Sequence, residues 1–374
     1  TAPKRQKDIW EVRKAGLNIM MSMKGDGKPV SFIEDCAVPL EHLAEYTDRL
    51  TQVFAKHGTR GTWYAHASVG TLHVRPVLDM RRDGAAKMRA IAEEASALVK
   101  QYKGAYSGEH GDGLARSEWI APFFGPRLTA CLAEIKGWLD PKGLMNPGKI
   151  VAPSRMDDAR LFRHPPGYAT RVPPTVLNWS EWGGFDKAVE MCNNNGHCRK
   201  FDAGTMCPSY RATRDEAHLT RGRANTLRLA LSGQLPFDAA KDALELCVSC
   251  KGCKRDCPTG VAMARLKIEY LAHYHARHGL KLRDRLIAYL PRYAPWLARV
   301  APLANLAQAV GKRLAGFAAE RSLPAWRRDP FGGEAKATGR GREVVLWVDT
   351  FNRYFEPENA RAALRALEAA SYRV

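Results

Sequence analysis

The sequence lacks several features that would place the protein in or beyond a membrane. None of its apolar runs is long enough to span a bilayer, so we expect no transmembrane helix. The first residues contain neither a methionine nor the apolar core of a signal peptide, so nothing indicates secretion and the sequence has the character of an internal fragment. There are only nine cysteines, an odd number, and seven of them lie between Cys192 and Cys257. Such clustering is typical of metal binding rather than of a disulfide framework, so we predict a cytoplasmic location.

Acidic residues are scarce relative to basic ones. With 58 Lys and Arg against 39 Asp and Glu, the formal net charge is +19. A basic surface can bind nucleic acid, an anionic membrane, an acidic carrier protein or anionic substrates. The sequence contains no recognisable nucleic-acid motif, and its basic residues are spread along the chain with a local excess over residues 277–328. We therefore predict no nucleic-acid partner and keep peripheral attachment to the inner face of the membrane as an alternative.

The densest group of reactive side chains is a cysteine run with the spacing C-x2-C-x2-C-x3-C-P. It consists of Cys247, Cys250, Cys253, Cys257 and Pro258. In iron–sulfur proteins of this spacing, three close thiolates hold one 4Fe-4S cluster and the fourth reaches a second cluster. A structural zinc site needs only two pairs of ligands and is the alternative interpretation. An earlier group also ends in Cys-Pro and consists of Cys192, Cys198 and Cys207.

The N-terminal part of the chain alternates between helical and strand patterns. The predicted elements are a helix start at 8–15, a strand at 29–38, a helix at 40–57, two strands over 61–77 and a helix at 84–102. A glycine-rich loop with many ionisable groups follows at 106–116. This alternation favours an α+β fold with helices over one antiparallel sheet.

Three histidines and one carboxylate carry the chemistry that we predict for this part. His66, His73 and Glu109 form a set suited to a divalent metal with an open coordination position. Such a metal would bind the hydroxyl and carboxylate oxygens of a 2-hydroxyacid and lower the pKa of its hydroxyl group. His110 would then be the free base. The arginines available to bind a substrate carboxylate in bidentate fashion are Arg13, Arg75 and Arg116.

Three separated motifs carry a family resemblance. They are His66-x6-His73, the segment 107–113 with the sequence SGEHGDG, and the segment 140–149 with the sequence DPKGLMNPGK. In this order they resemble the C-terminal domain of FAD-linked oxidases of the D-2-hydroxyacid dehydrogenase type, over residues 1–152. The resemblance implies that a D-2-hydroxyacid, such as D-2-hydroxyglutarate or D-lactate, is oxidised by a flavoenzyme whose FAD is bound mostly by a preceding domain.

The resemblance also implies roles for individual residues. His66, His73 and Glu109 would bind a divalent metal, zinc or manganese. His110 would accept the hydroxyl proton of the substrate, and Arg13 would contact the substrate carboxylate. Many family members have Asn where this chain has Arg75, and an arginine there favours a substrate with an additional negative charge. The residues expected to contact the flavin are Glu109, His110 and Asn146.

The two cysteine groups lie between helical segments and resemble the α-helical ferredoxin domain of succinate dehydrogenase and glycolate oxidase iron–sulfur subunits. The resemblance implies that one 4Fe-4S cluster is held by Cys207, Cys247, Cys250 and Cys253. A second cluster would use Cys192, Cys198 and Cys257, which leaves it one ligand short. Three alternatives stay open: His197 completes the second cluster, a residue outside this sequence completes it, or that cluster is absent.

The C-terminal part predicts short helices and then the beginning of another domain. Prolines at 291, 295, 302 and 324 indicate broken helices over 281–328. A buried strand at 343–351 and a helix at 356–370 resemble the start of the α/β cysteine-rich domain of glycolate oxidase and heterodisulfide reductase subunits. The predicted domains are the FAD-linked oxidase C-terminal domain (1–152), a linker (153–183), the α-helical ferredoxin domain (184–285), a helical and linker region (286–341) and the start of the cysteine-rich domain (342–374).

Together these features predict a fragment of a flavin- and iron–sulfur-dependent dehydrogenase. It would oxidise a D-2-hydroxyacid to the 2-oxoacid and pass electrons from FAD through 4Fe-4S to a quinone or a carrier protein. A homo-oligomer is a further expectation. The alternative interpretations are a non-catalytic iron–sulfur electron-transfer subunit, and a zinc protein whose basic surface binds nucleic acid.

Overall fold

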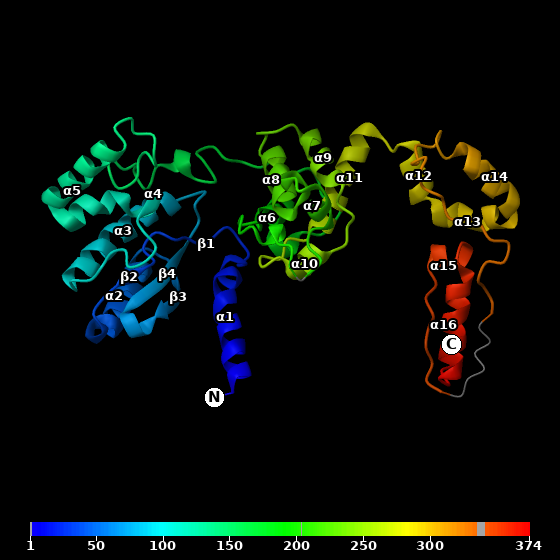
Figure 1. Ribbon diagram of the computed structural model, residues 1–374, viewed down its shortest axis with the longest axis horizontal. Coiled ribbons are helices and arrows are strands. Elements are labelled where there is room, and N and C mark those ends of the chain that lie inside the picture. The colour runs from blue at the N-terminus through cyan, green and yellow to red at the C-terminus, as the bar shows by residue number, and fades with distance from the viewer. Residues whose placement is uncertain (1, 203, 335–340) are drawn as a thin grey trace. The chain divides into compact units, whose positions relative to one another are not determined.

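The computed structural model describes residues 2–202, 204–334 and 341–374 (Figure 1). Contacts within the chain divide it into two units, Thr1–His273 and Tyr274–Val374. No helix in the described ranges is both long and apolar enough to cross a membrane. The finer division into five parts stays a prediction.

The first unit contains a small antiparallel sheet built around one strand. Its strands are β1 (Lys28–Pro29), β2 (Cys36–Ala37), β3 (Gly61–His66) and β4 (Thr71–Leu78). The first three all pair with β4 in antiparallel register. Almost every residue of β4 is buried, as expected for a central strand with neighbours on both edges. The predicted α+β fold with an antiparallel sheet is therefore confirmed.

Two helices, α2 (Leu43–Lys56) and α3 (Gly84–Gln101), share one apolar core with this sheet (Figure 1). Along α2, Tyr46, Leu50 and Phe54 repeat at a spacing of four residues and are fully buried. Burial of each such side chain contributes about 1.5–3 kcal/mol. Their core partners include Leu72, Val74, Ile91 and Ala95. This core fixes the position of the β3–β4 hairpin.

The strand predicted at 29–38 is largely replaced by a turn, and the prediction is wrong there. Only Cys36 and Ala37 pair as β2, while residues 32–35 bend. Asp35 has a left-handed φ of 76°, which is uncommon for a residue other than glycine. Its carboxylate accepts hydrogen bonds from the backbone N–H groups of Glu109 and His110. These tertiary hydrogen bonds favour the turn over a regular strand.

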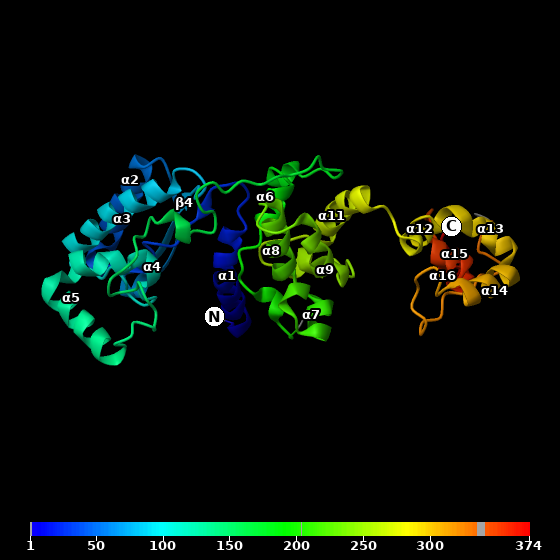
Figure 2. The ribbon, with the colours of Figure 1, turned by 90° about the horizontal axis from the view of Figure 1, so that it is seen from above.

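The remaining helices of the first unit lie in the regions around the sheet and around the clustered cysteines. Figure 2 shows α6, α8, α9 and α11 gathered into one helical group. The α-helices not yet described are α1 (Pro3–Met21), α4 (Gly113–Arg116), α5 (Ile120–Leu139), α6 (Phe185–Glu190), α7 (Pro208–Thr213), α8 (Thr220–Leu231), α9 (Ala240–Glu245), α10 (Gly252–Asp256) and α11 (Met263–His278). The short 3-10 helices are Leu40–His42, Ala67–Val69, Ser117–Trp119, Ala159–Leu161, Ser180–Trp182, η6 (His197–Arg199), Glu216–His218 and Phe237–Ala239. The predicted helical character of the region around the cysteines is confirmed.

Residues 153–183, the predicted linker, contain no α-helix or strand but are anchored by Glu269 of α11. The buried Glu269 carboxylate accepts hydrogen bonds from the N–H groups of Val176 at 2.9 Å and Leu177 at 3.0 Å. It also accepts one from Trp179 Nε1 at 2.9 Å. Burial alone would raise the pKa of Glu269, but these donors outweigh it and lower the pKa. The end of the linker is thereby tied to α11.

The second unit contains the short helices that the prolines predict. They are α12 (Leu282–Ala288), α13 (Leu290–Arg299), α14 (Ala301–Gly311), α15 (Thr350–Tyr354) and α16 (Pro357–Ala369). The helix predicted at 356–370 is confirmed as α16. The buried strand predicted at 343–351 is wrong, because Val345 and Trp347 are 87% and 88% exposed. A strand needs a hydrogen-bonded partner, and within the described residues this segment makes only one bridge, from Glu343 to Arg373.

Candidate active site and iron–sulfur site

The β3–β4 hairpin places two of the predicted histidines next to each other. In its register His66 lies opposite Thr71, and Tyr64 lies opposite His73. The turn needs glycine at Gly70, which has a φ of 69° and whose added Cβ would lie 1.9 Å from the carbonyl oxygen of Val38. The His66 and His73 rings consequently approach edge to face, with centroids 5.0 Å apart.

Glu109 is the point on which the three predicted histidines converge. Its Oε1 atom lies 3.0 Å from Nε2 of His73 and 3.3 Å from Nε2 of His66. The same oxygen lies 3.7 Å from Nε2 of His110. His73 is buried between the rings of Tyr64 and His110, with centroid distances of 4.7 and 4.8 Å. The structure thus brings together His66, His73, Glu109 and His110, which we call the histidine cluster.

Asp35 belongs beside this cluster, although the sequence did not single it out. Its Oδ2 atom accepts the N–H groups of Glu109 and His110, both at 2.7 Å. Its Oδ1 atom is buried and has no hydrogen-bond partner among the described residues. Asp35, His73, Glu109 and His110 each offer one ligand atom, and these atoms all lie within 4.8 Å of one another. This set differs from the predicted one, since Asp35 and His110 stand in place of His66.

Glu34 is a second acidic residue that the sequence did not indicate. It is buried, accepts a hydrogen bond from Arg75 Nε, and lies with Oε1 3.5 Å from Nδ1 of His110. Burial raises the pKa of Glu34, but the hydrogen bonds from Arg75 and Ser31 reverse the effect and lower it. Because Arg75 is paired with this ionised carboxylate, its charge is already largely compensated before any substrate binds.

The other predicted contact residues lie at the rim. Arg13 of α1 donates from Nη2 to Nδ1 of His66 at 3.1 Å, which brings a guanidinium to the edge of the histidine cluster. Arg116 instead donates to the backbone oxygens of Glu34 and Gly111, so it has a structural role. Asn146 lies in the exposed loop after α5 and has a φ of 45°.

The protonation state of His73 suits a metal ligand. Burial lowers its pKa, and the neighbouring His110 and His66 lower it further, while Glu109 acts in the opposite direction. A neutral imidazole offers a lone pair at physiological pH. Two imidazoles with carboxylates are a donor set that fits a divalent ion such as zinc or manganese.

Four of the predicted cysteines line one cavity. Residues 247–253 form what we call the second cysteine loop, and residues 192–198 form the first cysteine loop. The cavity is lined by Cys207, Cys247, Cys250 and Cys253. Four sulfur ligands around one space are what a 4Fe-4S cluster requires. Cys192 and Cys198 are buried elsewhere in the same region.

Family comparisons match the two parts of the chain that contain these groups of residues. Residues 1–150 match the family of FAD linked oxidases, C-terminal domain, and residues 188–261 match the 4Fe-4S dicluster domain. The first of these matches contains the whole histidine cluster, and the second contains all seven clustered cysteines.

The chain is also similar to curated enzymes over nearly its full length. It is 31% identical to a D-2-hydroxyglutarate dehydrogenase of Pseudomonas putida and 29% identical to one of Escherichia coli, over 98% and 97% of this chain. It spans only 42% and 41% of the length of these relatives. A mitochondrial D-lactate dehydrogenase [cytochrome] of Arabidopsis thaliana is 29% identical over 40% of this chain and 26% of that protein.

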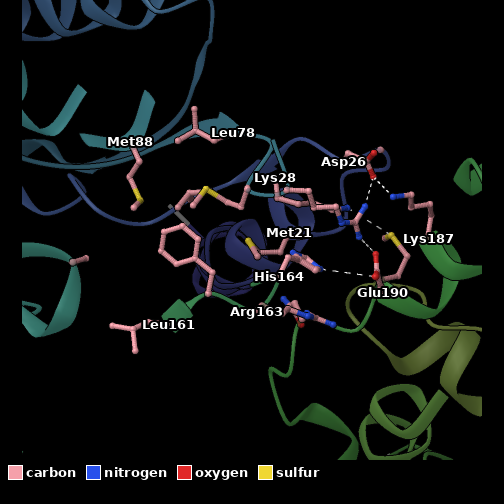
Figure 3. A pocket seen from close by; sticks show the side chains of 18 of the residues that line it. Met21, Asp26, Lys28, Leu78, Met88, Leu161, Arg163, His164, Lys187 and Glu190 are labelled. Carbon is pink, nitrogen blue, oxygen red and sulfur yellow. Dashed lines mark hydrogen bonds and ion pairs between the residues drawn. The ribbon is translucent and has the colours of Figure 1, made fainter. Parts of the chain in front are cut away.

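A separate cavity of about 360 Å³ lies between the FAD-linked oxidase domain and the start of the 4Fe-4S domain (Figure 3). One side is apolar and includes Met21, Leu78, Met88 and Leu161, and the other carries Lys28, Arg163, His164 and Glu190. Burial lowers the pKa of His164 to about 4, and the nearby arginines, first Arg81 and then Arg163, add to the effect. The described residues that line this cavity include no member of the histidine cluster, so it is not the site of the predicted chemistry.

Sequence reasoning missed Glu34 and Asp35 for an identifiable reason. Both lie within an apolar run that has the composition of a strand. The available signal was the pair of adjacent carboxylates inside this apolar run. A buried charge requires a partner, so the pair indicated contacts with polar groups elsewhere in the chain.

Proposed function

We propose that this chain is the substrate-binding and electron-exit part of an FAD-linked dehydrogenase that oxidises a D-2-hydroxyacid to the 2-oxoacid. The observation that carries the proposal is the convergence of His66, His73 and His110 on Glu109. The names of the similar proteins from P. putida and E. coli support D-2-hydroxyglutarate as the first candidate substrate, with D-lactate as the second.

In this proposal the metal ligands are His66, His73 and Glu109, with Asp35 as a further carboxylate within reach. A divalent ion there would hold the hydroxyl and carboxylate oxygens of the substrate and make the hydroxyl group more acidic. Binding of both oxygens to the ion would orient the substrate carbon that is oxidised.

His110 is proposed as the base that accepts the hydroxyl proton. Its Nδ1 atom faces the carboxylate of Glu34 at 3.5 Å, and its backbone N–H is held by Asp35. A carboxylate beside one ring nitrogen orients the imidazole and stabilises the positive charge that it gains, as in other histidine bases.

Arg13 is proposed to bind the substrate carboxylate, because its guanidinium reaches the cluster through His66. Arg75 is proposed as a second cation near the substrate, although its pairing with Glu34 reduces its net charge there. Glu109, His110 and Asn146 are the residues proposed to face the flavin.

When bound, FAD supplies two-electron oxidation at the substrate carbon, and 4Fe-4S clusters carry electrons singly. The four cysteines that line one cavity supply the four thiolates that one such cluster needs. The acceptor is proposed to be a quinone or a carrier protein. Since the chain spans about 42% of its similar proteins, we propose that FAD is bound mostly by residues outside it.

Peripheral attachment to an anionic membrane surface is proposed for the second unit. Around α13 and α14, Trp296, Leu303 and Val310 are 66–74% exposed, and the basic Arg292 and Arg299 accompany them. Apolar side chains with basic neighbours suit an anionic bilayer surface. Sedimentation with anionic vesicles, and not with neutral ones, is the expected result.

The test of the enzymatic function is an assay of the complete polypeptide that carries this chain, with a dye acceptor and a panel of D- and L-2-hydroxyacids. We expect turnover of a D-acid and a decrease in kcat of about 10²–10⁴-fold in His110→Ala. His42→Ala, outside the histidine cluster, is the control and should retain activity. Absence of turnover on every D-acid, or an unchanged kcat in His110→Ala, would contradict the proposal and favour a non-catalytic electron-transfer subunit.

A further inference from the structure

The two cysteine loops of the 4Fe-4S domain have the same pattern of backbone conformation. In the second cysteine loop the third and fifth residues, Ser249 and Lys251, have φ values of 54° and 61°. In the first cysteine loop the third and fifth residues are Asn194 and Gly196, with φ values of 65° and 75°. A left-handed backbone is uncommon for residues other than glycine, so its occurrence at both equivalent positions indicates that the two loops share one conformation.

A helical turn also begins at the sixth residue of each loop. It is η6, which starts at His197, in the first loop and α10, which starts at Gly252, in the second. The loops can therefore be aligned residue by residue without a gap. His197 takes the place of Gly252, a residue with no side chain that could bind metal.

The alignment shows which ligand position differs. The outer cysteines of the first loop, Cys192 and Cys198, correspond to the outer cysteines of the second. At the middle position Asn195 corresponds to Cys250, and both residues are exposed. The first loop therefore has the geometry of a cluster-binding loop with its central thiol replaced by an amide.

The Asn195 side chain is already used within its own loop. Its Oδ1 atom accepts the N–H of His197 at 2.8 Å, and its Nδ2 atom donates to Oδ1 of Asn193 at 2.6 Å. A neutral amide is also a poor substitute for a thiolate at iron, since clusters of this type are held by charged sulfur ligands. We expect no iron bound at this position.

The third thiol for the first loop is Cys257. The Cys-Pro after the first loop, at Cys207, lines the cavity of the second loop. Cys257 lines a different cavity, to which Met191, the residue before Cys192, and Cys253 of the second loop also contribute. In iron–sulfur proteins with the spacing of the second loop, the fourth cysteine binds the other cluster, so we assign Cys257 to the first loop.

We propose that Cys192, Cys198 and Cys257 bind a three-iron 3Fe-4S cluster with Asn195 at its open corner, beside a four-iron cluster on the second loop. A cubane held at three of its corners lacks a protein ligand for the fourth iron, and that iron leaves as Fe²⁺. The remaining three-iron core reaches its oxidised 3Fe-4S state when an added one-electron oxidant removes one electron. This inference rests on the iron–sulfur part of the proposed function and is independent of the substrate.

The test uses the complete polypeptide, purified and kept without oxygen. An oxidised three-iron cluster is paramagnetic, whereas an oxidised four-iron cluster of the ferredoxin type gives no EPR signal. We expect an EPR signal in the oxidised protein and about seven iron atoms per chain, four in one cluster and three in the other. No substrate is needed, so this result does not depend on the dehydrogenase assay.

Three substitutions, one of them a control, assign the signal to the first loop. Asn195→Cys supplies the missing thiol, so the oxidised-state signal should disappear and the iron content should rise to about eight. Asn193→Cys adds a thiol at a position that corresponds to Val248 and should leave both readouts unchanged. Cys192→Ser should remove the oxidised-state signal and keep the reduced-state signal of the four-iron cluster.

Three outcomes would overturn the inference. Wild-type protein with about four iron atoms and no oxidised-state signal would have no second cluster, and about eight iron atoms without that signal would mean two four-iron clusters. An oxidised-state signal that persists in Cys192→Ser would come from damage to the other cluster. The wild-type measurement alone decides the question if Asn195→Cys fails to fold.

Discussion

Nη1 of Arg223 lies 3.7 Å from the sulfur of Cys207, and the arginine side chain is fully buried. The same guanidinium donates from Nε to the backbone oxygen of Ala243 and from Nη2 to Oγ of Ser209, both at 2.7 Å. A positive charge held beside a cluster ligand stabilises the more negative, reduced state of the cluster.

Replacement of Arg223 should therefore make the four-iron cluster harder to reduce. In Arg223→Met we expect the reduction potential to fall by about 60 mV or more, a tenfold change in a one-electron equilibrium. Arg223→Lys keeps the charge and should shift the potential less. A redox titration followed by EPR measures both, with Arg49→Met in the FAD-linked oxidase domain as the control. Equal potentials in wild type and Arg223→Met would refute the electrostatic role.

Removal of the Glu109 carboxylate should weaken metal binding at the histidine cluster. Glu109→Gln keeps the size of the side chain but loses the anionic oxygen that faces all three histidines. Metal affinity should drop at least about tenfold. Elemental analysis for zinc and manganese after dialysis checks this, and Glu45→Gln on α2 is the matched control. Undiminished metal content would show that the ion binds elsewhere.

Asp35 should act as a positioning residue for Glu109 and His110. Asp35→Asn tolerates the left-handed backbone but weakens the two hydrogen bonds to the N–H groups of Glu109 and His110. We expect metal affinity and kcat to fall about 10–100-fold, with a small change in unfolding midpoint. Asp48→Asn, exposed on α2, should leave metal affinity unchanged. A large loss of stability with normal metal affinity would instead indicate a purely structural role.

His164 should make the protein less stable in acid. Its pKa of about 4 lies below the ordinary value of 6.5, so the unfolded chain binds more protons between these values. Its stabilising contribution is complete above about pH 6.5 and is lost as the pH falls toward 4. Between about pH 7.5 and 5.5 this amounts to about 1.4 kcal/mol in the free energy of unfolding.

His164→Phe keeps a ring but cannot be protonated, so it should lose that part of the pH dependence. Urea unfolding of both proteins at the two pH values gives the difference. His42→Phe should retain the pH dependence of the wild type. If wild type and His164→Phe lose the same free energy of unfolding on acidification, His164 does not titrate in this range.

The histidine cluster could be predicted because its parts follow local rules. Two histidines on either side of a tight turn meet across a hairpin, and a glycine-framed Glu-His pair reaches a ligand easily. The iron–sulfur site could be predicted for the same reason, because three of its cysteine ligands are close in sequence and lie in a single loop.

Residues whose role depends on distant contacts escaped prediction. Asp35 has a left-handed backbone because its carboxylate accepts hydrogen bonds from N–H groups some 75 positions later in the chain. The apolar run around Asp35 does not reveal these distant contacts. The sequence predicted Arg75 as a substrate contact, but in the structure its guanidinium is paired with the carboxylate of Glu34. The segment 343–351 has the composition of a strand, yet a strand forms only beside a partner.

The carboxylate of Glu269 has a practical consequence for dissecting the molecule. A fragment that begins at residue 184 would lack Val176, Leu177 and Trp179, leaving a buried negative charge without three of its donors. Such a fragment should misfold or aggregate on expression. A fragment that begins before residue 173 retains the three hydrogen-bond donors to Glu269. The smallest autonomous piece around the cysteines therefore includes the end of the connecting segment.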